Sequence, residues 1–235
     1  MAAATFGSLQ TSVAQRLIDP NSIAVSNAIV QQAILDAVTF WKPRKFFFNQ
    51  AVANLTMDIS PALDGSAPSD PFVLQYGNTV ANYPNAPVLP SNFLVEDEDN
   101  GFVIPYNNLR YTMKKMPPQL YDGENIQGVG LPFIYTYRAG NYEFYWFPQI
   151  AYPLTVYYIK DYPDLVNAGD TNDFTKYAAN LLIYEAVSRV LSDVRLDDAR
   201  SARFKARAME EYENIKGRSF KQNATGRLTV DTILE

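Results

Sequence analysis

The order in which helical and strand-like segments follow one another constrains this chain most. Helical periodicity runs to about Trp41, a Tyr- and Phe-rich stretch from about Lys45 to Lys160 has strand character, and two charged helices follow from about Thr171 to Lys221. Because both ends are helical and the middle is not, the ends can meet in one bundle. We therefore expect an α+β fold, in which a bundle formed by the N- and C-terminal helices carries an inserted antiparallel β-sheet or sandwich lobe.

The segment boundaries follow from proline, glycine and helix-capping residues. A second helix is expected to begin near Asn21 or Ser22 and to end before Pro43, and Gly217 is expected to end the last helix. The predicted segments are the N-terminal bundle helices at 1–44, the β lobe at 45–165, the C-terminal bundle helices at 166–217 and an extended docking tail at 218–235.

The clearest strand signal is a pair of aromatic runs. Residues 133–138 and 142–147 flank a short loop that contains Gly140 and Asn141, which predicts a β-hairpin. A third strand, 154–160, is expected to follow Pro153, and the strands together predict an antiparallel sheet or small sandwich.

Composition excludes several kinds of chemistry. The chain has no Cys and no His, which rules out disulfides, zinc sites of the Cys/His type, cysteine nucleophiles and Ser-His-Asp triads. We expect no catalytic, cofactor or metal site. The net charge of −5 disfavours DNA as a ligand, although DNA could pass nearby without binding. No apolar run approaches the ~18 residues of a membrane span, so we expect a soluble chain made in a cytoplasm, with no membrane partner.

Two local motifs resemble ligand sites but have simpler interpretations. The acidic run from Glu96 to Asp99 could bind calcium, but the EF-hand spacing from Asp97 reaches Asn108 instead of a Glu, so a solvated acidic loop is favoured. Gly123 and Gly128 have phosphate-loop spacing without the Lys and Ser/Thr that such a loop requires.

Exposed aromatic residues are the next candidate surface. Alternation along strands places about half of the aromatic side chains in the core and leaves the other half for a partner. The candidates for an interface surface are Tyr142, Tyr145, Trp146 and Tyr157. The alternative is a sugar-stacking platform in a carbohydrate-binding or glycoside-hydrolase module, although no pair of carboxylates stands out.

The last helix, from about Asp197 to Lys216, carries the remaining candidates. Arg200, Arg203 and Arg207 lie on one side of it, where like charges repel unless acids from elsewhere are near. The side expected to pack against neighbouring elements is a stripe of small residues: Ala199, Ala202, Ala206 and Met209. The tail beyond it has few apolar residues, and the proposed contacts there are Phe220, Leu228, Val230 and Ile233.

Several stretches, taken in order, resemble one protein family. They are "FWKPRKFFFNQ", "LPSNFL", "PFIYTYRAGNYEFYWFP", "YPLTVYYIKDYPDL" and the closing segment from "DTNDFTKYAANLL" to "AMEEYENI". From about Ser22 to Ile215 the chain is similar to the head-to-tail adaptor, or connector, proteins of tailed bacteriophages. Each motif alone is a weak pattern of apolar and aromatic residues, and their order carries the resemblance.

The resemblance implies a structural virion protein without catalytic residues. It implies a ring of twelve copies beneath the portal protein in the virion neck, which joins the portal to a tail nozzle or tube protein and lets DNA pass through its channel during genome ejection. Assembly would take place in the host cytoplasm. The three arginines and the tail would contact the portal or a neighbouring copy.

Overall fold

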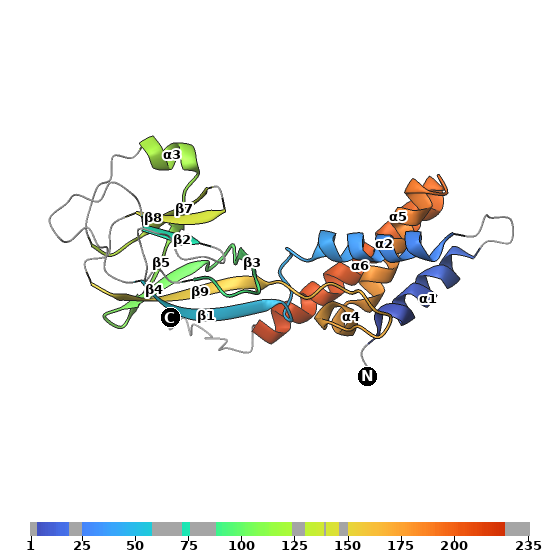
Figure 1. The fold of residues 1–235 in the computed structure, drawn as a ribbon, viewed down its shortest axis with the longest axis horizontal. Helices are drawn as coiled ribbons and strands as arrows, with labels where there is room; N and C mark the ends of the chain where they lie inside the picture. Colours follow the sequence, from blue (N-terminus) through green and yellow to red (C-terminus); the bar gives the residue numbers. More distant parts are fainter. Residues whose placement is uncertain are drawn as a thin grey trace, which may run out of the picture. The chain divides into compact units, whose positions relative to one another are not determined.

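The computed structural model describes residues 4–18, 25–57, 72–75, 88–123, 130–138, 140–145 and 150–223, and at 72–75, 121–123, 145 and 220–223 it describes the backbone alone. The expected α+β fold is confirmed (Figure 1). The chain divides into two compact units, a helical unit of Met1–Asn49 with Asp161–Glu235 and a β unit of Gln50–Lys160. Residues 45–49 and 161–165, expected in the β lobe, belong to the helical unit because Phe46, Phe48 and Leu165 are buried in its core.

The helical unit has one continuous apolar core. Its helices are α1 (Phe6–Leu17), α2 (Asn27–Trp41), α4 (Asp173–Tyr177), α5 (Ala179–Asp193) and α6 (Asp198–Asn223). Helix α5 is buried on several sides, as indicated by apolar positions that cover most of its circumference. Trp41, Phe46 and Phe174 are fully buried. Aromatic rings from α2, from the segment after it and from α4 therefore pack together, so N-terminal and C-terminal parts of the chain share one core.

Helix starts follow local capping chemistry. Thr5 caps α1 and Ser8 completes a capping box with it, while Asn172 and Thr175 do the same at α4. The expected start of the second helix near Asn21 or Ser22 is wrong, because Ser26 caps α2 and its side chain accepts a hydrogen bond from the amide of Ile29.

Helix α6 departs from expectation at its end. It continues past Gly217 to Asn223, so residues 218–223 are helical and not part of an extended tail. Packing explains the extension. Ser219 is buried, its hydroxyl donates to the carbonyl of Ile215, and it accepts a hydrogen bond of 2.9 Å from the amide of Phe47.

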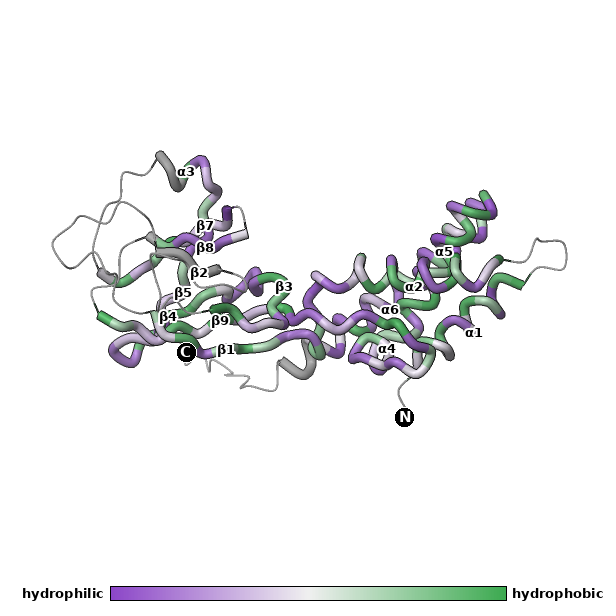
Figure 2. Tube along the Cα trace, viewed as in Figure 1, coloured by the Kyte–Doolittle hydropathy of each residue, from purple (hydrophilic) through white to green (hydrophobic). Residues whose placement is uncertain are grey.

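The buried side of α6 also differs from the expected one. The predicted stripe is exposed, and Met209 keeps 41% of its surface. The buried positions Ala208, Ile215 and Ser219 lie on another side, where Phe204 and Tyr212 also join the core. Figure 2 shows α6 as more hydrophilic than α1, α2 or α5. It therefore has few apolar residues from which its buried side could be predicted.

The β unit consists of two sheets. In the first, the strand order is β1-β9-β4-β5 and β3 also pairs with β9, all antiparallel. The strands are β1 (Gln50–Met57), β3 (Phe93–Glu96), β4 (Phe102–Tyr106), β5 (Leu109–Thr112) and β9 (Tyr152–Lys160). In the second, the order is β2-β8-β7-β6, with β6 parallel to β7. The strands are β2 (Phe72–Gln75), β6 (Lys114–Lys115), β7 (Ile134–Arg138) and β8 (Asn141–Tyr145), and α3 (Pro118–Gly123) follows β6 in the chain.

The predicted hairpin is confirmed as β7–β8, and Gly140 in its turn has φ +87°. The predicted third strand is β9, which lies in the first sheet between β1 and β4 and not in the sheet of the hairpin. The two sheets are joined through aromatic side chains. The ring centroid of Phe102 in β4 lies 4.8 Å from that of Tyr135 in β7 and 5.2 Å from that of Phe144 in β8.

Among the helices that the structure describes, none combines the length and the apolar character that crossing a bilayer demands.

Candidate interaction surfaces

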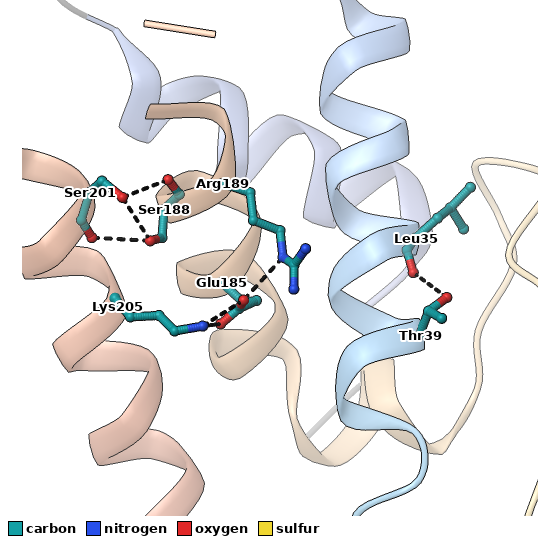
Figure 3. A network of polar contacts seen from close by, with 7 residues as sticks. All are labelled: Leu35, Thr39, Glu185, Ser188, Arg189, Ser201 and Lys205. Carbon is teal, nitrogen blue, oxygen red and sulfur yellow. Dashed lines mark hydrogen bonds and ion pairs between the residues drawn. The ribbon is translucent and has the colours of Figure 1, made fainter. Parts of the chain in front are cut away.

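A buried carboxylate fixes α6 against α5. Glu185 is 1% exposed, and both of its oxygens lie 2.8 Å from the Nζ atom of Lys205 on α6. The Nε atom of Arg189 donates to the same carboxylate at 3.0 Å (Figure 3). Two cations thus compensate the cost of burying the charge. One helical turn away the hydroxyls of Ser188 and Ser201 each donate to the other residue's carbonyl, which fixes the rotation of α6.

The three predicted arginines occupy different surroundings on α6. Arg200 already has a carboxylate from its own chain, because its Nε atom lies 3.7 Å from Asp197 Oδ2. This corrects the expectation that another chain must supply all three. The guanidinium of Arg207 lies 5.5 Å from the ring of Phe204. In the part of the chain that the structure describes, neither Arg203 nor Arg207 forms an ion pair, and both are exposed. These two remain open to a partner.

The tail contacts are mostly not described. Phe220 lies in α6, where only its backbone is described, and Leu228, Val230 and Ile233 lie outside the described residues. Their role in docking stays a prediction.

The four aromatic residues predicted for an interface have different surroundings. Tyr142 is 3% exposed and its ring packs 5.0 Å from Phe102, so the expectation of an outward-facing ring is wrong for this residue. Tyr157 is half-buried on β9, and Arg110 donates to its hydroxyl and lies over its ring. The side chain of Tyr145 is not described, and Trp146 lies outside the described residues. No platform of stacked exposed rings is assembled by the side chains that are described.

The acidic run is also not the solvated loop that was expected. Glu96 and Asp97 are each 5% exposed, although Glu98 and Asp99 face solvent. Glu96 accepts hydrogen bonds from the Nζ atom of Lys115 and the hydroxyl of Tyr142, so it joins the two sheets. Burial and this carboxylate raise the pKa of Tyr142 far above its ordinary value. No cluster of three potential metal ligands occurs among the described residues, and the acidic run has a structural role.

A group of cations and aromatic rings was missed at the sequence level. The guanidinium carbon of Arg44 lies 5.0 Å from the ring of Phe40, 4.7 Å from that of Trp41 and 5.5 Å from that of Tyr212. The ring of Phe40, which is 39% exposed, also has Arg189 at 5.2 Å and Lys205 at 4.8 Å. The motif "FWKPR" contains part of this group. Its α5 and α6 members become neighbours only in the folded unit.

On another side of α2 lies an open pocket of about 480 Å³. Its α2 wall includes Leu35, Val38 and Thr39, and the segment after β9 supplies Asp164 and the exposed Val166. The side-chain Nδ2 atom of Asn172, which also lines the pocket, is buried without a hydrogen-bond partner among the described residues. The helical unit therefore has two distinct surface features on either side of α2.

The arrangement as a whole offers contact surfaces and no assembled catalytic centre among the described residues. The sequence matches the family model described as SU10 adaptor protein over residues 4–231. No curated protein matches the sequence significantly. The matched family is a structural one and not an enzyme class, and it implies association with phage portal and tail components in the virion neck. Since the match spans nearly the whole chain, the protein belongs to the SU10 adaptor protein family, a family of bacteriophage head-to-tail adaptors.

Proposed function

We propose that this chain is the subunit of an adaptor ring that joins the portal protein to a tail nozzle or tube protein and forms part of the DNA channel. The observation that carries the proposal is the family match over residues 4–231. Twelve copies form the ring, which lies in the virion neck after assembly in the host cytoplasm. A channel lets DNA pass during genome ejection without binding it specifically, in keeping with the net charge of −5.

The portal contacts proposed for this function involve α6 and the segment that follows it. Arg203 and Arg207 are exposed on α6 and take carboxylates of the portal. The segment after Asn223, which contains Leu228, Val230 and Ile233, lies along the portal and adds its strand-like sequence to an exposed edge there. Tyr157 belongs to the β unit, which contacts the tail component.

The proposal is tested by co-expression with the portal protein encoded by the same phage. An affinity tag on the portal should retain this chain, and averaged electron micrographs should show a rotationally symmetric ring on one end of the portal. If the chain is absent from the purified portal and no added density is seen, the proposed function is wrong.

A further inference from the structure

We infer that neighbouring copies of this chain contact one another through two oppositely charged faces of the helical unit. The cationic face consists of Arg44, Arg189, Lys205 and Lys216 around the rings of Phe40 and Tyr212. The acidic face consists of residues 161–173 with the adjoining pocket on α2. The inference rests on the ring proposed above and assigns its subunit contact.

The cationic face is prepared for a carboxylate from outside the chain. Among the described residues, the carboxylate of Glu185 is the one that forms ion pairs with these cations, and it contacts Arg189 and Lys205. Among the described residues, no carboxylate or hydrogen-bond acceptor contacts the guanidinium of Arg44. Three rings hold this planar group in place, so its N–H edge is pre-oriented for bidentate bonding to a carboxylate.

This combination of groups is typical of protein contacts. Arginine and large aromatic residues dominate the binding energy of protein interfaces when they are held in place before binding. The half-exposed ring of Phe40 adds an apolar surface beside the charge. DNA is a poorer candidate for this face, because a chain of net charge −5 repels a phosphate backbone at long range.

The acidic face lies elsewhere on the same unit. The segment 161–173 contains four Asp residues and no Lys or Arg, and Asp161 forms an ion pair with Lys42, which also lines the pocket. Asp164 is exposed at the pocket, beside Val166, which keeps 74% of its surface. This face offers the exposed carboxylate of Asp164 next to an open pocket of about 480 Å³ with a mixed polar and apolar lining, which complements a cationic face with an exposed ring.

Helix α2 separates the two faces. Leu35 and Thr39 lie on the side of α2 away from Arg189 and Glu185 (Figure 3), and they line the pocket of the acidic face. At about 100° per residue, Phe40 lies roughly opposite Val38 on this helix. One unit therefore presents complementary faces in different directions. Such a pair forms a heterologous contact, and repetition of a heterologous contact generates a ring when the rotation closes.

The experiment compares charge reversals by sedimentation velocity over a wide range of protein concentration. Lys216→Glu reverses an exposed charge on the cationic face, and Asp164→Lys reverses one on the acidic face. Each alone should weaken self-association by about tenfold, and the double variant should restore it. Lys114→Glu, an equal charge change at an exposed position of the β unit, is the matched control. Arg44→Glu should weaken association further, provided that circular dichroism shows an intact fold.

Several outcomes would overturn the inference. One is a wild-type protein that stays monomeric throughout the concentration range. Another is equal self-association of Lys216→Glu and Lys114→Glu. A third is a double variant that associates no more strongly than either single variant. Retention of a double-stranded oligonucleotide by the wild type but not by Lys216→Glu would assign the cationic face to DNA instead. Recruitment to the tagged portal is measured separately. Recruitment without the predicted charge dependence removes only this inference, whereas no recruitment of the wild type removes the proposed function.

Discussion

Replacement of Glu185 by Gln tests whether the buried carboxylate holds α6 in place. In the wild type both oxygens lie 2.8 Å from the Nζ atom of Lys205, and one of them also accepts from Arg189 at 3.0 Å. In the variant an NH₂ group takes the place of one oxygen and faces a cationic donor. One charge-assisted hydrogen bond is lost and a buried donor is left unpaired, which costs about 1–3 kcal/mol each.

The net loss should be smaller than the sum of these two costs. The side chains of Lys205 and Arg189 are 43% and 31% exposed, so water can solvate both cations once the carboxylate is gone. We therefore expect the free energy of unfolding of the helical unit to fall by about 2 kcal/mol.

Urea unfolding followed by tryptophan fluorescence measures this loss. The chain has two Trp residues, so a Trp146→Phe background leaves Trp41, in the core of the helical unit, as the only reporter. Glu210→Gln, an exposed change on α6, is the control and should stay within about 0.5 kcal/mol of the parent. A Glu185→Gln loss no larger than that of the control would show that desolvation cancels the ion pairs, and the reasoning would fail.

Further predictions concern the tail, the exposed arginines and alkaline pH. Truncation after Asn223 should leave the unfolding transition unchanged but abolish retention by the tagged portal; full retention would show the tail to be dispensable. Reversal of Arg203 and Arg207 to Glu should lower retention about tenfold with no change in fold, and unchanged retention would exclude both from the portal contact. Burial and Glu96 raise the pKa of Tyr142 and Tyr135 above the unfolded value of about 10, so their contribution to stability is complete below pH 10 and is lost as the pH rises further. Tyrosinate absorbance should therefore show these two groups ionising only together with unfolding of the β unit, and ionisation in the folded unit would contradict this.

The sequence predicts the local elements better than their packing. The hairpin of β7 and β8 follows from its own residues, because alternating aromatic runs and a Gly-Asn turn are sufficient to define it. The pairing of β9 with β1 does not follow from local sequence. These two strands are about a hundred residues apart, and the packing of the whole β unit determines that they pair. The family relationship was also accessible from the order of the weak motifs.

The surfaces were harder to predict, for reasons that differ between residues. On α6 an alanine stripe indicated the wrong side, because the half-buried Phe204, Lys205 and Tyr212 use long side chains to cover the core on the other side. Glu96 belonged to a run of four acids that suggested solvent, and only its bonds to Lys115 and Tyr142 explain its burial. The cation–aromatic cluster around Arg44 includes Tyr212, which is far away in the sequence, so the sequence alone does not show the cluster.

The two ends of the inserted β unit have a consequence for the order of folding. Gln50 and Ile159 are paired across β1 and β9, so the chain enters and leaves this unit at neighbouring points. Once the insert has folded, the two halves of the helical unit are joined as if by a short loop instead of one of about a hundred residues, which removes roughly 3–4 kcal/mol of loop-closure entropy. During synthesis, the insert is complete before α5 and α6 leave the ribosome. It can therefore fold first, and its paired ends then hold α4, α5 and α6 close to α1 and α2 while the helical unit forms.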